Sequence, residues 1–363
     1  MPAITRRSST SYPVSILLAG IFAFQLAGIH AAELYFPPED GEWETVTPAA
    51  VGWNAELLSQ ALDLAGERDS SGVVILHNGR IMGERYFSSP DNAVYQNYLQ
   101  GYDARGAAIE DVASAQKSVI AVLTGMAQER GFLSIEDPVS DYLGEGWSNA
   151  SAAQEKAITV EHLLSMSSGL DTEFGYVAEP DTEWLYNTPV YHSLARVLMA
   201  ATGLERNELT INWISRPLGM TNTSWTPRPW AAAAIAVGLS TTARDLSRFG
   251  LMIQAGGKWG EQVILGDTEY LHDMLDSSQA MNPAYGYLWW LNGKEFVRND
   301  GSSGVLIESA PDDLIAMQGA ADRKLYLVPS LGLVITRLGY AGGLPGSSFN
   351  DAFWEALIRA APE

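Results

Sequence analysis

The stretch Ala113-Ser114-Ala115-Gln116-Lys117-Ser118 contains the only Ser-x-x-Lys sequence in the chain. Apolar residues recur after it at helical spacing, so the sequence predicts a helix that starts at Ser114 and ends near Gly131. Residues three apart at a helix start share one face, and the Lys117 amine can therefore reach the Ser114 hydroxyl. Free N–H groups at the helix start also favour an oxyanion. The alternative interpretation is a serine that only caps the helix, beside a solvated lysine.

Runs of strand-forming residues lie toward both ends of the chain. Residues 73–77 and 80–87 flank Asn78-Gly79, a pair typical of the type I′ turn of a β-hairpin, in which both central residues need positive φ. The proline-containing segment 33–50 before them is expected to be an extended lead-in. Three more strand runs and a last amphipathic helix follow near the C-terminus, at 314–318, 324–328, 333–338 and about 350–360.

Residues between these two groups have the patterns of helices joined by long connections. Thr159 can cap one helix, Thr188 precedes a proline that would open a second, and Thr242 with Asp245 can form a capping box for a third. The order of strands, helices, strands and helix predicts an α/β protein of the α+β type. Its antiparallel sheet would be built from both ends of the chain and flanked by helices, since a doubly wound parallel sheet needs strict alternation.

The hexapeptide around Ser114 resembles the first motif of serine β-lactamases and penicillin-binding proteins. The resemblance is closest to class C β-lactamases, family VIII carboxylesterases and 6-aminohexanoate-dimer hydrolases, and it covers roughly residues 70 to 340. It implies a β-lactamase/transpeptidase-like fold, with a discontinuous α/β domain at 32–135 and 240–363 and an inserted all-helical domain at 136–239. Further matches lie at His162–Leu170, Gly238–Leu246 and Tyr285–Trp290.

The second motif of the resembled family is Tyr-x-Asn, and two places compete for it. Tyr95-Gln96-Asn97 has the literal pattern but precedes Ser114, whereas the family order places the motif after the serine. We therefore assign it to Tyr186-Asn187-Thr188, where the resemblance implies that the Tyr186 phenol relays protons as general base and then acid. The alternative is an aromatic ring packed beneath a helix start. Thr188 replaces the family's Asn and is suited to cap its own helix.

The third motif of the family, Lys-Thr-Gly or His-x-Gly on a strand, has no literal counterpart here. By register Met317-Gln318-Gly319 occupies its position, and the Ala320 backbone N–H would then complete an oxyanion hole with that of Ser114. The missing strand cation and Thr188 both argue against efficient β-lactam hydrolysis. Four aromatic residues could line an acyl pocket, although a Trp-Trp pair is also typical of a core: Trp184, Tyr287, Trp289 and Trp290.

The N-terminus and the composition favour an exported protein. Arg6 and Arg7 precede an apolar run from Val14 to Gly28, which predicts a signal peptide over residues 1–31. The run is shorter than the roughly 20 residues of a spanning helix, so no stable membrane anchor is expected. The absence of cysteine excludes thiol catalysis and disulfides, and a net charge of −21 makes nucleic-acid binding unfavourable.

Other catalytic motifs are missing from the sequence. There is no Gly-x-Ser-x-Gly elbow, and the five histidines lack metal-ligand spacing, so neither a metal nor a cofactor is expected. The sequence therefore predicts an exported serine hydrolase, periplasmic or secreted, that cleaves small esters or linear amides through an acyl-enzyme on Ser114. The alternatives are a β-lactamase or D-amino-acid peptidase, and a non-catalytic ligand-binding protein on the same fold.

Overall fold

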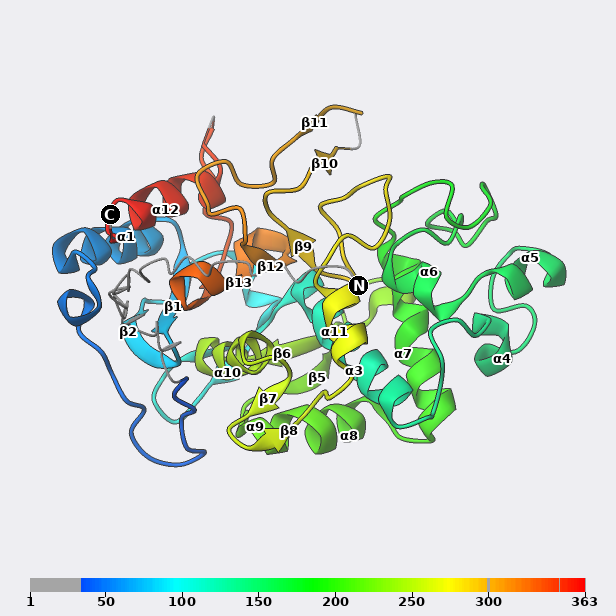
Figure 1. Cartoon of the computed structure of the whole chain (residues 1–363), viewed down its shortest axis with the longest axis horizontal. Coiled ribbons are helices and arrows are strands. Elements are labelled where there is room, and N and C mark those ends of the chain that lie inside the picture. The colour runs from blue at the N-terminus through cyan, green and yellow to red at the C-terminus, as the bar shows by residue number, and fades with distance from the viewer. Residues whose placement is uncertain (1–33, 299–300, 346, 363) are drawn as a thin grey trace, which may run out of the picture. The chain divides into compact units, whose positions relative to one another are not determined.

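The main sheet has six strands in the order β2-β1-β14-β13-β12-β9, and every pair is antiparallel (Figure 1). The computed structural model describes residues 34–298, 301–345 and 347–362, so the predicted signal peptide lies outside the described residues. Both ends of this part of the chain supply strands, which confirms the expected topology. They are β1 (Ser70–His77), β2 (Arg80–Tyr86), β9 (Trp290–Leu291), β12 (Ile315–Gly319), β13 (Arg323–Val328) and β14 (Leu333–Gly339).

The turn between β1 and β2 has the conformation expected from its two residues. Asn78 has φ +47° and Gly79 has φ +84°, as a type I′ turn requires. Gly79 is also needed for space, because a Cβ there would lie 1.8 Å from the Tyr35 carbonyl oxygen. The turn therefore fixes the register of the hairpin and holds the extended lead-in against it.

Helices cover both faces of the main sheet. Val73 and Ile75 on β1 belong to the core with α1 (Ala55–Glu67) and α12 (Phe349–Ile358), whereas Val74 and Leu76 face the core with α3 (Gln116–Glu129) and α10 (Ala243–Gln254). This alternation is the period-2 pattern of a strand buried on both sides. The sequence analysis did not predict α1.

A second sheet has four strands in the order β3-β4-β6-β5. Its strands are β3 (Leu99–Tyr102), β4 (Ala108–Asp111), β5 (Ser224–Pro227) and β6 (Val237–Thr241). The region predicted to be helical thus ends in β5 and the start of β6, and the two-domain division remains a prediction. The other helices are α2 (Ala93–Gln96), α4 (Val139–Leu143), α5 (Ala152–Ala157), α6 (Val160–Leu164), α7 (Thr188–Thr202), α8 (Arg206–Thr210), α9 (Arg216–Leu218) and α11 (Thr268–Met274).

Short elements complete the described part of the chain. A π-helical turn, Ile211–Ser215, joins α8 to α9, and two small hairpins are formed by β7 (Lys258–Trp259) with β8 (Gln262–Val263) and by β10 (Phe296–Val297) with β11 (Ser303–Gly304). No helix among the described residues is both long and apolar enough to cross a membrane.

The helix caps agree with the sequence in two places and differ in one. Thr159 caps α6 and Thr242 caps α10, each through its hydroxyl. The predicted cap of α7 by Thr188 is wrong, because Asn187 is the N-cap and its side-chain oxygen accepts the Val190 N–H. Both residue types cap helices well, and the one-residue difference leaves the Thr188 hydroxyl for another partner.

Candidate active site

Ser114 lies in a tight turn that leads directly into α3. A 3₁₀ turn spans Ala113–Ala115, and the α-helix begins at Gln116, two residues later than predicted. Ala113 has φ +52°, a backbone conformation that costs an alanine about 1–2 kcal/mol. Such strain persists only where neighbouring groups hold the chain in place, and it is frequent at functional sites.

Lys117 is buried and contacts the proposed nucleophile. It is 2% exposed, and its Nζ donates hydrogen bonds to Ser114 Oγ and to Thr188 Oγ1, both at 3.0 Å. Burial, with a smaller effect of the Arg228 charge, lowers the pKa of Lys117 to about 7. An amine with this pKa is largely neutral at mildly alkaline pH and can accept a proton, which a solvated lysine cannot readily do.

Tyr186 lies on the other side of Ser114, in the segment just before α7. Its phenol lies close enough to Ser114 to interact with that side chain, and burial raises the pKa of the phenol to about 12. The rings of Tyr186 and Tyr191 each have their centroid 4.8 Å from Lys117 Nζ. The competing Tyr95 is fully buried elsewhere, with its hydroxyl 2.9 Å from Glu110 Oε1. The structure therefore brings Ser114, Lys117 and Tyr186 together and leaves Tyr95 outside the site.

An aromatic cluster adjoins the Tyr186 ring. We use this name for Trp184, Tyr186, Tyr285, Trp290 and Phe296. Ring centroids within it lie 4.8 Å apart for Tyr285 and Trp290, 5.5 Å for Tyr186 and Trp290, and 5.7 Å for Trp290 and Phe296. Trp184, Tyr186, Trp290 and Phe296 are only partly buried, so the cluster offers an apolar surface that continues from the Tyr186 ring.

The end of β12 approaches the same turn from the main sheet. A Cβ at Gly319 would lie 2.2 Å from the Val112 carbonyl oxygen, so the strand can come this close only with glycine. Ala320 then opens a 3₁₀ turn (Ala320–Asp322) that packs against the Ser114 turn. The two segments proposed for the oxyanion hole are therefore neighbours.

The comparison with protein families agrees with this geometry. A family model described as Beta-lactamase matches residues 55–343. The chain belongs to this family. Its fold is β-lactamase/transpeptidase-like, which confirms the fold predicted from the sequence. The helix α3 that follows Ser114 contacts both β12 of the main sheet and α7.

Individual relatives of this β-lactamase-family protein are distant. An uncharacterised protein of Alkalihalophilus pseudofirmus is 23% identical over 322 residues, which are 80% of this chain and 89% of the relative. A solved structure provisionally named a β-lactamase, from Bacteroides dorei, has a TM-score of 0.65 at 20% identity, over 85% of this chain and 99% of that one. A structure provisionally named a 6-aminohexanoate-dimer hydrolase, from Bacillus anthracis, has a TM-score of 0.62 at 17% identity, over 89% of this chain and 88% of that one.

Trp289, predicted to contact substrate, belongs instead to the core of this family member. It is 0% exposed and stacks on Phe249 with ring centroids 6.3 Å apart. The prediction that Tyr287 lines an acyl pocket is also wrong. Tyr287 is 4% exposed and donates its hydroxyl hydrogen to Glu161 Oε1 at 2.6 Å. Trp290, the residue after Trp289, belongs to the aromatic cluster.

Met317, at the position of the family's strand cation, is 0% exposed and faces the core around α3. The next residue, Gln318, points to the opposite face of the sheet, where its Oε1 accepts a hydrogen bond from Lys324 Nζ at 2.8 Å. Lys324 therefore does not replace the missing cation near Ser114.

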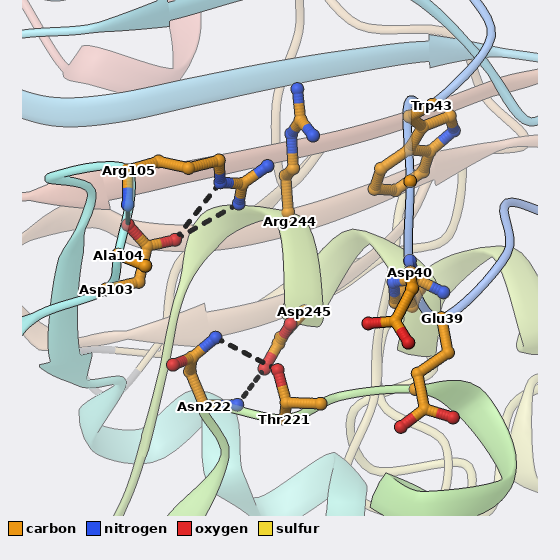
Figure 2. A pocket seen from close by; sticks show the side chains of 13 residues that line it. Glu39, Asp40, Trp43, Asp103, Ala104, Arg105, Thr221, Asn222, Arg244 and Asp245 are labelled. Carbon is orange, nitrogen blue, oxygen red and sulfur yellow. Dashed lines mark hydrogen bonds and ion pairs between the residues drawn. The ribbon is translucent and has the colours of Figure 1, made fainter.

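A separate cavity of about 330 Å³ lies at the start of α10 (Figure 2). Its three arginines already have partners, since Arg105 pairs with Asp103, Arg244 pairs with Glu84, and Arg248 donates to the Pro37 and Leu218 carbonyls. None of Ser114, Lys117 and Tyr186 lines it. Within the described residues no group of three or more His, Cys, Asp or Glu side chains could hold a metal ion. This cavity is therefore not the site around Ser114.

Proposed function

We propose that this protein is a serine hydrolase that cleaves carboxylic esters or linear amides through an acyl-enzyme on Ser114. The observation that carries the proposal is the proximity of the Ser114 hydroxyl to both a tyrosine and a buried lysine whose pKa is lowered to about 7. Lys117 Nζ lies 3.0 Å from Ser114 Oγ, and the Tyr186 phenol lies beside the same serine. A nucleophile with a base in reach, itself oriented by further groups, is the general arrangement of nucleophilic catalysis.

The proposed reaction has two halves. The Ser114 Oγ–H proton passes to the Lys117–Tyr186 pair while Oγ forms a bond to the substrate's carbonyl carbon. The bond from that carbon to the leaving oxygen or nitrogen then breaks, and the leaving group takes up the proton. Water repeats the sequence on the acyl-enzyme, which releases the acid and restores the Ser114 hydroxyl. The Ser114 and Ala320 backbone N–H groups are proposed to stabilise the carbonyl oxygen as it becomes negative.

The preference for esters and linear amides over β-lactams rests on the surroundings of Ser114. The aromatic cluster supplies apolar surface for an acyl or leaving group, and Met317 supplies no cation for a β-lactam carboxylate. The similarity to the structure provisionally named a 6-aminohexanoate-dimer hydrolase supports linear amides, at the level of the fold.

The test compares wild type with Ser114→Ala on a short-chain p-nitrophenyl ester, a chromogenic cephalosporin and a linear aminohexanoate amide. We expect wild type to hydrolyse the ester or the amide fastest and the variant to hydrolyse none. A dominant cephalosporin rate would favour a β-lactamase, and no turnover by wild type would favour the ligand-binding alternative. Equal turnover by both proteins would exclude Ser114 as nucleophile.

We also propose that the protein is exported, on the basis of the arginine pair and apolar run in residues 1–31. Cleavage after Ala31 would leave Ala32 as the first residue. N-terminal sequencing of the protein recovered from outside the cytoplasm of a bacterial host tests this, and recovery only of cytoplasmic chains that keep the leader would contradict it.

A further inference from the structure

A buried ion pair lies directly behind the Ser114 turn, formed by residues 117 positions apart in sequence. Arg228, in the loop after β5, donates from Nε to Asp111 Oδ2 at 2.5 Å and from Nη2 to Asp111 Oδ1 at 2.7 Å. The two side chains are 7% and 1% exposed. The sequence analysis singled out neither residue, and the proposed reaction uses neither.

Asp111 holds the backbone of the turn that carries Ser114. Its Oδ1 accepts the Ala113 N–H at 2.8 Å, and the preceding Val112 is fixed by a hydrogen bond from its N–H to the Leu239 carbonyl at 2.9 Å. These bonds hold the chain on the N-terminal side of Ala113, the residue with positive φ. The carboxylate therefore stabilises the strained conformation that presents Ser114.

Arg228 extends the same contact to the residue just before Lys117. Its Nη2 donates to Gln116 Oε1 at 3.0 Å, and the same oxygen accepts the Leu239 N–H at 3.0 Å. Gln116 is 1% exposed. The guanidinium group thus links Asp111, two residues before the strained Ala113, to Gln116, the first residue of α3, on either side of Ser114.

Gly238 on β6 leaves the room that the ion pair occupies. A Cβ at this position would lie 2.2 Å from Asp111 Oδ2 and 2.4 Å from Arg228 Nε. Any side chain there would displace the pair. A buried ion pair is often no more stabilising than apolar side chains of the same size, so stability alone does not account for this arrangement.

We propose that Asp111, Arg228 and Gln116 form a positioning network that holds the Ser114 turn and the start of α3 in reacting geometry. The proposal rests on the function proposed above and deepens it. None of the three residues is placed against substrate, so they are positioning residues and not catalytic ones. Their effect should appear in kcat and in the protonation of Lys117, not in substrate binding.

The charge of Arg228 gives the network a second, measurable effect. Arg228 adds to burial in lowering the pKa of Lys117. The other ionisable groups around Lys117 come from α7 and its approach, where Tyr186 and Tyr191 face the ammonium group and His192 is shifted by it. From α8, Arg206 adds positive charge beside Tyr191 and His192. Removing Arg228 leaves Asp111 without its counter-charge, so the Lys117 ammonium becomes more favourable.

The test uses Arg228→Met and Arg228→Lys, with Arg244→Met as the matched control. Arg244 makes an equivalent double contact with Glu84, with both side chains largely buried, but lines the separate cavity. Lys117 is one of only five lysines, so its titration can be followed by NMR of protein labelled at lysine Cε and assigned with Lys117→Met. The pH profile of ester hydrolysis is measured on the same samples.

For Arg228→Met we expect the midpoint of the Lys117 titration to rise above about pH 7. The midpoint of the acid limb in the pH profile of kcat/KM should move to higher pH with it. We also expect kcat to fall roughly 100-fold, with KM little changed. Arg228→Lys keeps the charge but loses the double hydrogen bond to Asp111, so the Lys117 midpoint should stay near that of wild type while kcat falls. Arg244→Met should change neither the Lys117 midpoint nor kcat. If Arg228 had only a structural role, Arg228→Met would lower the folded fraction and leave the midpoint of the Lys117 titration unchanged.

A folded Arg228→Met protein with wild-type kcat and Lys117 midpoint would overturn the network. If that variant does not fold, Gln116→Met keeps the ion pair, and unchanged kcat in it would overturn the proposal equally. The NMR titration needs no substrate. An inactive wild type whose Lys117 midpoint still rises in Arg228→Met would therefore reject the proposed function and keep the network.

Discussion

Thr188 Oγ1 accepts a hydrogen bond from Lys117 Nζ at 3.0 Å, the same distance that separates Lys117 Nζ from Ser114 Oγ. The threonine occupies the position of the Asn in the resembled Tyr-x-Asn motif and is not the cap of α7. Its hydroxyl therefore helps to hold the amine toward the serine. This contact gives the site a direct test of how Lys117 is oriented.

Thr188→Val removes the acceptor and keeps the shape of the side chain. We expect kcat for ester hydrolysis to fall about 10-fold, the value of one hydrogen bond to a charged or strongly polar partner. Thr188→Ser, which keeps the hydroxyl, should retain most of the activity. Equal rates in the two variants would show that the hydroxyl does not orient Lys117.

Lys117→Met should abolish activity but stabilise the protein at neutral pH. Unfolded Lys117 binds its proton up to about pH 10.5, whereas burial lowers the pKa in the folded protein to about 7. The native state is therefore disfavoured below pH 10.5, by up to about 4 kcal/mol at pH 7, offset in part by the bonds that the amine makes. Chemical denaturation at several pH values measures this difference.

The stability gain of Lys117→Met should shrink as the pH rises from 7 toward 10.5, where the unfolded lysine also loses its proton. In wild type, activity should rise with pH through about 7 because the neutral amine is the form that accepts a proton. A stability gain that is constant across this range would mean that the pKa of Lys117 is not lowered in the folded protein.

Tyr186→Phe keeps the ring in the aromatic cluster and removes the proton relay. We expect kcat to fall about 10²–10⁴-fold, with little change in the free energy of unfolding. The control is Tyr285→Phe, in the same cluster, because the Tyr285 hydroxyl is buried without a hydrogen-bond partner among the described residues. That variant should keep its activity and be at least as stable as wild type, and comparable losses in both would point to packing instead of proton transfer.

Trp184→Ala tests whether the aromatic cluster selects apolar acyl groups. We expect kcat/KM for a p-nitrophenyl hexanoate to fall about 10-fold more than that for the acetate, as for loss of apolar contact in a pocket. Trp259→Ala is the control, since Trp259 packs on Phe36 away from the cluster with ring centroids 5.1 Å apart. An unchanged hexanoate-to-acetate ratio in Trp184→Ala would place the acyl group elsewhere.

Local patterns in the sequence were sufficient to predict the contact of Ser114 with Lys117, because a separation of three residues at the start of a helix places two side chains on the same face. The assignment of Tyr186 to the site came from the order of the motifs along the chain. The antiparallel sheet was predicted from the order of strands and helices. The helix α1 was not predicted, although Asn54 before an amphipathic stretch was a signal for it: Asn54 caps the helix and Leu58, Ala61, Leu62 and Ala65 are its buried face.

Two features could not be predicted from local pattern. Leu288 has φ +61°, which interrupts any regular alternation, so the sequence could not show that Trp289 points into the core while Trp290 reaches the site. The Asp111–Arg228 pair joins β4 to the loop after β5, and only the folded chain brings these two residues together.

The most direct test of the central claim is the mass of the protein during turnover. Wild type mixed with a p-nitrophenyl ester and quenched in acid should gain the mass of one acyl group, and peptide mapping should place that group on Ser114. Ser114→Ala should gain none. An acyl group on any other residue, or rapid hydrolysis by the Ser114→Ala variant, would contradict the account.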